Sequence, residues 1–427
     1  MTERISTGCV VVGGGPAGMM LGYLLARAGV EVAVLEKHGD FLRDFRGDTV
    51  HPSTLQVMHE LGLLDRFLAL PHQRIHELRV RMGDQTVPVA DFAHLPTRCR
   101  FIAMMPQWDF LNFLARQAER YSTFRVHMST EATSLLEEDG RVVGVRANGP
   151  NGSLEIRAML VVGANGRQSA LTEQSGLKSV SFGAPMDVLW FRLSKQREDL
   201  AESMAVFDPG RIFIVIERGE HYQVGFVIPK GSLETIHAAG LDAFKEAIGK
   251  LAPFARDRVS EILSWDQVKV LSVRIDRLQR WYKPGLLFIG DAAHAMSPVG
   301  GVGINLAIQD AVATANALAE PLRRGPVGVR DLEKVQRRRA FPTSATQRFQ
   351  IFMQDLVIRP TLAQNGDQAA SLGAEGSRRL PHLFRLLRAL PVLRRIPAYL
   401  IGIGVRPEHV RTPEMAEVGS PQGGNAP

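Results

Sequence analysis

The sequence predicts an α/β protein in which an antiparallel sheet is inserted into a largely parallel one. The first observation is a strand–turn–helix–strand unit within residues 9–35. The second is a pair of short, fully apolar strands, Met159–Val162 and Leu286–Ile289, each of which enters a turn that begins with glycine. Continuous apolar runs of this kind are typical of buried parallel strands. The third is a change of texture over residues 181–275, where strands separated by short turns favour antiparallel pairing.

The first unit is read directly from its apolar runs. Cys9–Val12 is a buried strand, Met19–Ala28 is a helix, and Glu31–Leu35 is a second strand. Gly29 stands between helix and second strand, where glycine commonly ends a helix. This order is that of a βαβ half-unit, which places both strands in one parallel sheet.

Three glycines lie in the turn between the first strand and its helix. Gly13 permits the tight turn, Gly15 lets a pyrophosphate approach the backbone, and Gly18 lets helix and strand pack closely. The pyrophosphate then lies at the helix N-terminus, where unpaired N–H groups and the helix dipole favour negative charge. Glu36 ends the second strand and is placed to accept hydrogen bonds from a ribose diol. The unit therefore predicts a bound dinucleotide.

The chain up to residue 180 continues to alternate helices with strands. Helices are predicted at Pro52–Leu61 and Pro106–Tyr121. Short apolar runs between turn residues predict strands at Phe124–Val126, Ala132–Leu136 and Val142–Ala147.

The inserted region has its own set of elements. An alternating pattern over residues 75–90 predicts two strands that leave the main sheet. Later strands are predicted at Val188–Leu193, Ile212–Glu217 and Tyr222–Val227, with a hairpin turn at Arg218–Glu220. Two helices and a closing strand follow, at Leu241–Ile248, Pro253–Leu263 and Val268–Val273.

A second informative stretch covers Gly285–Asp310. Its buried strand presents Asp291 at the carboxyl end, where ligands bind in open α/β sheets. A glycine-rich loop at 300–303 then opens a helix over Ile304–Leu322, whose first N–H groups would meet developing negative charge. A structural alternative for Asp291 is that it only caps the short turn of residues 292–294 that follows it. The neighbouring His294 is expected to pack locally rather than to act in catalysis.

Charge is concentrated near the C-terminus. The chain of 427 residues has a net charge of +7, and residues 377–411 contain eight arginines against Glu408, which is +7 by itself. The rest of the chain is therefore near neutral, which argues against a general nucleic-acid binder. Apolar residues at helical spacing accompany these arginines, so the segment is either an amphipathic helix on an anionic membrane surface or a packing helix with snorkelling arginines.

Cysteine usage and hydropathy indicate the compartment. The two cysteines are Cys9 and Cys99, and the first lies within a predicted buried strand, so a disulfide framework is not expected. Apolar runs stay well below the ~20 residues that span a bilayer, and the first strand starts too early to leave room for a signal peptide. We expect a cytoplasmic protein.

Three stretches together resemble a known family. In their order and spacing, Gly13–Glu36, Gly163–Ser169 and Gly290–Asp310 are similar to the class A flavoprotein monooxygenases of the p-hydroxybenzoate hydroxylase type, over residues 8 to about 340. The resemblance implies a Rossmann-type FAD-binding domain with an inserted antiparallel-sheet substrate domain and a helical C-terminus. The expected boundaries are 1–74, 100–180 and 276–340 for the FAD-binding domain, 75–99 and 181–275 for the substrate domain, 341–412 for the helical segment and 413–427 for a disordered tail.

The resemblance also implies roles for individual residues. Glu36 would contact the adenosine ribose, Arg46 the pyrophosphate, and Asp291 the ribityl chain, with Gln107 near the same chain. Arg46 could instead be a solvated arginine and Gln107 an ordinary helix N-terminal residue. No metal site is expected. The expected FAD-binding residues are Gly13, Gly15, Pro16, Ala17, Gly18, Glu36, Lys37, Arg46, Gln107, Asn165, Gly290, Asp291, Pro298, Gly301, Val302, Gly303, Ile304 and Asn305.

The middle stretch departs from the family pattern. Asn165 stands where the family usually has Asp, and Thr172 stands where it has Arg. That stretch is linked in the family to both FAD and reduced nicotinamide, so the departure affects the expected use of NADPH or NADH most. Arg167 is a candidate for the missing cation. The glycine motif occurs once, which fits a nicotinamide that visits the flavin without a second Rossmann domain.

The resemblance implies an FAD-dependent monooxygenase that hydroxylates an aromatic, polycyclic or lipophilic small molecule. It would use NAD(P)H and O2 and act through a C4a-hydroperoxyflavin. Two alternatives stay open, an FAD-dependent reductase without oxygen insertion and a flavin-binding protein with little turnover. No catalytic residue is assigned, and Arg192, His221 and Tyr222 are candidates for substrate contact on the inserted strands.

Overall fold

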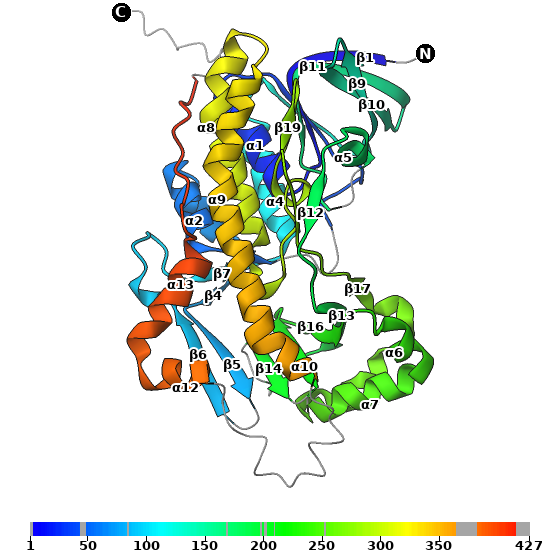
Figure 1. The fold of residues 1–427 in the computed structure, drawn as a ribbon, viewed down its shortest axis with the longest axis vertical. Helices are drawn as coiled ribbons and strands as arrows, with labels where there is room; N and C mark the ends of the chain where they lie inside the picture. The colour runs from blue at the N-terminus through cyan, green and yellow to red at the C-terminus, as the bar shows by residue number, and fades with distance from the viewer. Residues whose placement is uncertain are drawn as a thin grey trace, which may run out of the picture.

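The protein contains two main sheets, joined along one side by long helices (Figure 1). The structure is a computed structural model that describes residues 3–42, 48–82, 85–167, 170–196, 199, 203–208, 210–251, 253–363 and 382–415, with the side chains of 251–255 excepted. Figure 1 places the eight-stranded sheet in the upper half of the molecule and the seven-stranded sheet in the lower half.

The eight-stranded sheet has the strand order β19-β20-β11-β1-β2-β8, and β10 and β9 extend it from β11. The strands β20, β11, β1, β2 and β8 pair in parallel, whereas β19, β10 and β9 pair antiparallel. This arrangement confirms the predicted α/β class. The strands are β1 (Glu3–Val12), β2 (Val32–Leu35), β8 (Phe124–His127), β9 (Glu131–Glu138), β10 (Arg141–Gly149), β11 (Gly152–Gly163), β19 (Tyr282–Lys283) and β20 (Leu286–Phe288).

Helices complete this half of the molecule. α1 (Pro16–Arg27) contacts both α4 (Gln107–Ala118) and α8 (Gly303–Arg324), and its inward residues belong to one large apolar core with β1 and β20. α2 (Pro52–Glu60) and α3 (Leu64–Leu68) follow β3 (Thr49–Val50). The sequence predicted α1, α2, α4 and α8 to within a few residues, because each carries its apolar face in a continuous local pattern.

The seven-stranded sheet has the order β17-β13-β16-β15-β14-β5-β6. It is antiparallel except where β14 pairs in parallel with β5. The two strands predicted within residues 75–90 therefore belong to the same sheet as the strands of residues 181–275. Its strands are β5 (Glu77–Met82), β6 (Gln85–Asp91), β13 (Met186–Ser194), β14 (Met204–Asp208), β15 (Arg211–Glu217), β16 (His221–Pro229) and β17 (Lys269–Leu271).

The two faces of this sheet bury different partners. One face packs on α6 (Leu233–Ala239) and α7 (Leu241–Leu251), with Phe191 and Phe213 in that core. The opposite face carries Trp190, in an apolar cluster that also includes Val299. The helix predicted over Pro253–Leu263 is present as a 3-10 helix over Pro253–Glu261. The strand β14 was not predicted from the sequence.

Two small sheets connect the halves. β3, β7 (Ile102–Met104) and β4 (Gln73–Ile75) form one, with β7 in the centre, and β12 (Ser179–Ser181) pairs with β18 (Asp276–Leu278) in the other. None of the helices that the structure describes combines the length and apolar character needed to cross a bilayer.

The C-terminal part of the chain is mainly helical. α9 (Val329–Met353) lies along α8 and reaches the lower sheet (Figure 1), where it continues as a π-helix over Gln354–Ile358 and as α10 (Arg359–Ala363). α12 (His382–Ala389), a 3-10 helix (Pro391–Arg394) and α13 (Arg395–Gly402) then pack beside β6.

Residues 403–415, which we call the C-terminal strap, are not helical, although the prediction extended the helical segment to residue 412. Their polar contacts hold them in place. The N–H of Val410 donates to Oε2 of Glu60, and the N–H of Met415 donates to the carbonyl of Arg27. Residues 413–415, assigned from sequence to a disordered tail, are thus bound to α1, and residues 416–427 lie outside the described residues.

Candidate functional site

Four strand ends meet at one edge of the eight-stranded sheet. Val12 pairs with Leu35 on one side and with Gly163 on the other, and Gly163 pairs with Phe288. The segments that follow these residues are therefore neighbours in space, although the three motifs that contain them are separated by more than 100 positions in the chain. They are the glycine turn at 13–18, the acid at the end of β2, and the turns that follow β11 and β20. Carboxyl ends of parallel strands are where open α/β sheets bind ligands.

The glycine turn is built from close backbone approaches. Gly13 has a φ of 110°, and a Cβ atom there would lie 2.5 Å from the carbonyl oxygen of Ala164. A Cβ atom at Gly18 would lie 1.9 Å from the carbonyl oxygen of Gly13. Gly15 differs, because a Cβ atom at this position would meet no atom within 4 Å. Gly13 and Gly18 are thus required by the fold, whereas Gly15 leaves open space before α1.

Glu36 lies beside this turn. Its Oε2 accepts a hydrogen bond from the N–H of Gly14 at 3.0 Å, and its Oε1 accepts one from the N–H of His38 at 3.0 Å. Both carboxylate oxygens of Glu36 thus contact backbone N–H groups beside the glycine turn. Pro16 and Ala17 form the first turn of α1, and Lys37 is exposed.

The turn after β20 packs against the same helix. A Cβ atom at Gly290 would lie 3.2 Å from Cβ of Ala17, so Gly290 brings the two motifs together. Asp291 is about one-third exposed, and its Oδ2 accepts from Nε of Arg167 at 2.8 Å. Arg167 also donates to the carbonyl of Met296. The carboxylate of Asp291 is therefore paired with the cation that the sequence offered in place of the family's later arginine.

The glycine loop, residues 298–303, connects this turn to α8. Gly300 and Gly301 have φ values of 80° and 64°, which favour glycine. The hydroxyl of Thr49 donates to the carbonyl of Gly301 at 2.9 Å. Gly303 is the last residue of the loop and the first of α8, and Gly303 and Ile304 present N–H groups that have no intrahelical acceptor.

Asn305, expected at the cofactor, makes a contact within the protein. Its Oδ1 accepts from the hydroxyl of Ser53 at 2.6 Å and from that of Thr54 at 2.8 Å. The residue is buried. Its side-chain oxygen thus joins the start of α8 to the start of α2.

Three glutamines of α9 and its π-helical extension hold the segment that leads into the glycine loop. Gln350 accepts from the N–H of Ser297 and donates to the carbonyls of Ser297 and Val299. Gln347 donates to the carbonyl of Ala295, and Gln354 donates to the hydroxyl of Ser297. All three are buried. We call these three residues the glutamine clamp.

His51 is buried at the other side of the glycine loop. Its Nδ1 lies 2.8 Å from the carbonyl oxygen of Ile401 in α13. Burial lowers its pKa to about 4, although hydrogen bonds to backbone carbonyls oppose the shift. The imidazole is therefore neutral at physiological pH.

Asp48 links the site to the seven-stranded sheet. Its Oδ1 accepts from the N–H of Gln107 at 3.3 Å, and Arg218 of the β15–β16 hairpin pairs with its Oδ2. Arg218 also donates to Gln223. Burial raises the pKa of Asp48 to about 6, although Arg218 opposes the shift. Gln107 thus stands at the start of α4 next to a buried ion pair.

The three candidates for substrate contact lie on different faces of the sheet. Tyr222 belongs to the apolar core on the α6–α7 side and is buried there, away from the glycine loop. Its neighbour His221 points to the opposite face, because successive side chains of a strand alternate. Burial lowers the pKa of His221, and the nearby charges of Arg192 and Arg218 lower it further. Arg192 is exposed.

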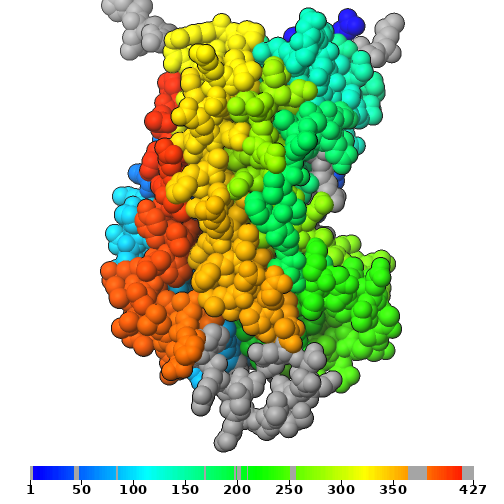
Figure 2. Space-filling view, in the orientation of Figure 1, coloured from blue at the N-terminus to red at the C-terminus, as the bar shows by residue number. Residues whose placement is uncertain are grey.

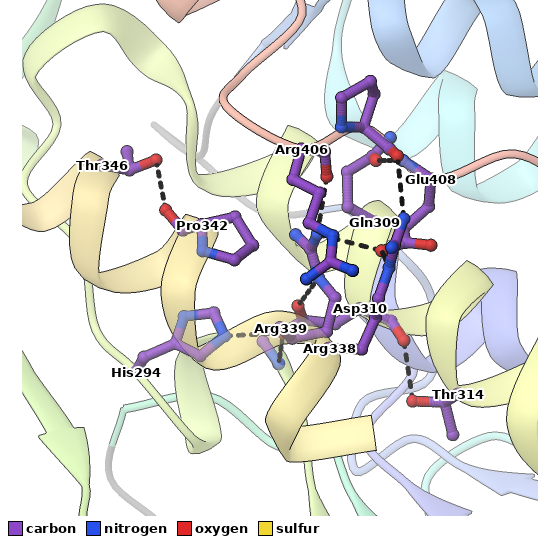
Figure 3. A network of polar contacts seen from close by, with 12 residues as sticks. His294, Gln309, Asp310, Thr314, Arg338, Arg339, Pro342, Thr346, Arg406 and Glu408 are labelled. Atoms are coloured by element: carbon purple, nitrogen blue, oxygen red, sulfur yellow. Dashed lines mark hydrogen bonds and ion pairs between the residues drawn. The ribbon is translucent and has the colours of Figure 1, made fainter. Parts of the chain in front are cut away.

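A buried ionic network lies behind the site (Figure 3). Oδ2 of Asp310 accepts from the N–H of Gly290 and lies 2.6 Å from Nε2 of His294, while its Oδ1 accepts from Arg339 at 2.8 Å. Burial alone would raise the pKa of Asp310, but His294 and Arg339 lower it to about 2. His294 is thus buried and contacts a partner inside the protein, and its expected lack of a catalytic role stays a prediction.

The same network reaches the C-terminal strap. Nη1 of Arg339 donates to the carbonyl of Arg406 and lies 3.4 Å from Oε1 of Glu408, and Arg338 pairs with the same carboxylate at 2.6 Å. Glu408, the single acid among the arginines of residues 377–411, is therefore paired inside the protein.

The described residues fit FAD on a structural test. A Cβ atom at Gly15 or at Gly303 would enter open space, so both backbones can be approached by a ligand. Nη1 of Arg167 is buried and has no protein partner among the described residues. Asn165 lies against Gly13. Arg46, together with residues 168 and 169 of the middle motif, lies outside the described residues. No cluster of metal-ligating side chains occurs among the residues that the structure describes.

Several contributors to this site were not identified from sequence. Asp48 and Arg218 are 170 positions apart, and local pattern carries no sign of their pairing. The glutamine clamp left a usable signal, because residues 347, 350 and 354 recur at the spacing of one helix face. Asp310 lies within the motif that drew attention to Asp291.

The chain is similar to known proteins both in sequence and in fold. The family described as "FAD binding domain" matches residues 6–348. The 6-methylpretetramide 4-monooxygenase of Streptomyces rimosus is 32% identical over 359 residues, which are 82% of this chain and 84% of the relative. The rifampicin monooxygenase of Rhodococcus hoagii is 28% identical over 418 residues, 93% of this chain and 78% of the relative.

A solved structure shares the fold. The anhydrotetracycline hydroxylase of Streptomyces rimosus superposes with a TM-score of 0.72 at 21% identity, and the match covers 93% of this chain and 76% of that chain. At this identity the likeness concerns the fold alone.

Proposed function

Because the chain belongs to the FAD-binding-domain family of class A flavoprotein monooxygenases, we propose that it hydroxylates a polycyclic aromatic small molecule with NADPH or NADH and O2. The chain is an FAD-dependent monooxygenase. The observation that carries the proposal is the alignment of Val12, Leu35, Gly163 and Phe288, which brings three motifs to one edge of the sheet.

The proposed FAD contacts follow from this edge. The pyrophosphate would lie over Gly15 at the N-terminus of α1, where N–H groups and the dipole favour negative charge. Glu36 would accept hydrogen bonds from the adenosine ribose, and Asp291 would meet the ribityl chain. Lys37, Arg46, Gln107 and Asn165 are proposed as further contacts.

The ring system would lie between the glycine loop and the substrate sheet. When bound, FAD supplies electron transfer from the nicotinamide and the activation of O2. The first N–H groups of α8 would stabilise negative charge on the ring edge. The glutamine clamp and Thr49 hold the loop that carries these N–H groups, so the donors are preorganised.

The substrate class is supported by the face of the seven-stranded sheet that bears Trp190. A Cβ atom at Gly225 would lie 3.0 Å from the Trp190 ring, so Gly225 is what allows the indole to lie across the neighbouring strand. The apolar cluster around Trp190 includes Val299 of the glycine loop. An apolar, aromatic surface suits a planar lipophilic substrate. His221 and Arg192 are proposed to contact its polar groups.

The compartment is also proposed. Cys9 and Cys99 are free and buried, which is compatible with a reducing environment such as the cytoplasm.

Oxygen-18 labelling tests the proposed reaction. The purified yellow protein would be supplied with NADPH or NADH and 18O2, with 6-methylpretetramide and rifampicin as first probes. We expect product with one oxygen-18 atom. Hydride transfer to a probe without label would contradict hydroxylation and favour a reductase. A flavin that remains oxidised with both nicotinamides and all probes would indicate a binding protein.

A further inference from the structure

The α12–α13 segment packs on the edge strand β6 with one side only. Phe384 of α12 shares an apolar cluster with Val87 of β6, and Ala398 and Ile401 of α13 share another with Ala90. The 3-10 helix between them also contacts β6. Because all three pieces lie against one strand, their outward sides form one surface of the molecule. Figure 2 shows this segment, in orange-red, at the lower left of the face in view.

The outward side is apolar where solvent exposure would favour polar residues. Val392 is 57% exposed and Ile396 is 59% exposed. The exposed apolar side chains of the segment are Leu386, Leu390, Val392, Ile396 and Tyr399. Single exposed apolar residues are ordinary, but a contiguous group bordered by charge marks an interaction site. Together with the exposed Arg385, Arg388 and Arg395, we call this group the basic apolar surface.

The charge of this surface has one sign. Residues 382–407 contain five arginines and no acidic residue. Arg394 is used inside the segment, where it donates to the carbonyl of Leu387, and Arg388 reaches Gln85. A second copy of the chain placed face to face would bring these arginines together, so self-association through this surface is unfavourable. A partner with a dense, fixed negative charge fits better.

We propose that the basic apolar surface binds peripherally to an anionic lipid bilayer. Amphipathic helices with arginines beside bulky apolar residues lie in the plane of the bilayer interface. The arginine stems cover apolar surface while their guanidinium groups reach lipid phosphates. The inference does not depend on the reaction proposed above. It resolves the two readings of the sequence, because Phe384 and Leu387 supply the packing side while five other apolar residues point outward.

Vesicle co-sedimentation of the FAD-loaded full-length protein tests the proposal. The probes are phosphatidylcholine vesicles with and without one quarter phosphatidylglycerol. We expect binding to the anionic vesicles that weakens as salt is raised, because the attraction to the surface potential is screened. Binding to neutral vesicles should be weaker by at least tenfold.

Two variants separate the two parts of the surface. Arg385→Gln with Arg395→Gln should weaken binding about 30-fold, since each arginine near an anionic leaflet contributes about 1 kcal/mol. Leu390→Ser, Val392→Ser and Ile396→Ser together should weaken binding about 100-fold through lost apolar burial. Matched controls lie elsewhere on the protein, namely Leu263→Ser, which removes a side chain that is 77% exposed, and Arg323→Gln on α8. The controls should bind as the parent does.

The result that overturns the proposal is equally direct. Absence of binding to anionic vesicles, or binding that both surface variants retain, contradicts it. A dimer in light scattering that these variants dissolve would assign the surface to a second copy instead. The flavin content and urea midpoint of each variant show that it is folded, so loss of vesicle binding cannot be attributed to unfolding.

Discussion

His51 shows how a single buried side chain makes stability depend on pH. The unfolded residue has a pKa near 6.5, whereas burial lowers the pKa to about 4 in the folded protein. Between these values the unfolded state binds more protons, so the free energy of unfolding falls as the pH falls. At about 1.36 kcal/mol for each unit of pKa, this residue removes about 3 kcal/mol between pH 6.5 and 4.

The variant His51→Asn tests this prediction, because Asn can still donate to the carbonyl of Ile401 and does not titrate. Urea unfolding would be followed from pH 7.5 to 4 for both proteins. The variant should be less stable at pH 7.5, and the difference should shrink as the pH falls. Asp48, whose pKa is raised to about 6, loses its contribution in the opposite direction, as the pH rises. Its effect cancels in the comparison. A constant difference at every pH would contradict the assignment.

The position of a single site residue could be predicted from sequence where it depends on residues that are close to it in the chain. Glu36 was located because it ends the strand that follows the glycine turn. Tyr222 was a candidate for substrate contact beside His221, but the two residues are adjacent in one strand, so their side chains lie on opposite faces and Tyr222 lies in the α6–α7 core. Arg218 and Asp48 were missed because their contact depends on how two distant sheets meet.

The glutamine clamp is the clearest case of one element positioning another. Gln350 satisfies one N–H and two carbonyls of the segment that precedes the glycine loop. Gln350→Met keeps the volume but leaves these groups without partners. Each buried unsatisfied group costs about 1 to 3 kcal/mol, so we expect the free energy of unfolding to fall by about 3 kcal/mol.

Urea denaturation measures this loss. The control is Arg348→Met, which changes an exposed neighbour on the same helix and should alter stability by less than about 0.5 kcal/mol. FAD affinity should fall with Gln350→Met as well, because the loop loses its support. Equal stability of the two variants would show that the clamp does not hold the loop.

Asp310 joins α8 to α9 and, through Arg339, to the C-terminal strap (Figure 3). Asp310→Asn removes the charge that compensates Arg339 and changes the side chain that His294 contacts. Breaking a buried ion pair from one side typically costs about 3 to 5 kcal/mol, and we expect a loss in that range by urea unfolding. Glu320→Gln on the same helix breaks an exposed pair with Arg324 and should cost about 0.5 kcal/mol or less.

Limited proteolysis supplies a second measurement of the same network. Release of the strap should make residues 403–412 more accessible to cleavage in Asp310→Asn than in Glu320→Gln. Unchanged cleavage together with unchanged stability would show that the network does not hold the strap.

Elements with a strong local period were predictable, and those fixed by distant pairing were not. α1 and α8 carry long apolar faces. β14 is five residues long, and it pairs along its whole length with β15 and over three residues with β5, more than 100 positions earlier. The helical prediction failed over residues 403–412 because their stability comes from contacts with Glu60, Gln309 and Asn316 rather than from helix formation.

The whole molecule is organised around the edge where four strand ends align. The fold class and the three motif segments could be predicted because each motif is contiguous in sequence. Their assembly depends on close contacts, such as Gly13 on Ala164 and Gly290 on Ala17. The second sheet is tied to this edge by Asp48 and Arg218. The division of the chain into an FAD-binding and a substrate domain is a proposal that rests on this arrangement.

FAD affinity of Gly15→Ala tests the central claim most directly. The added methyl group enters open space, so the protein should fold as before, but the methyl stands where the pyrophosphate must approach. In fluorescence titrations we expect the parent to bind FAD tightly, Gly15→Ala to bind at least tenfold more weakly, and Gly328→Ala, at the distant start of α9, to match the parent. A parent protein that takes up no FAD, or a Gly15→Ala variant that binds FAD as tightly as the parent, would contradict the account.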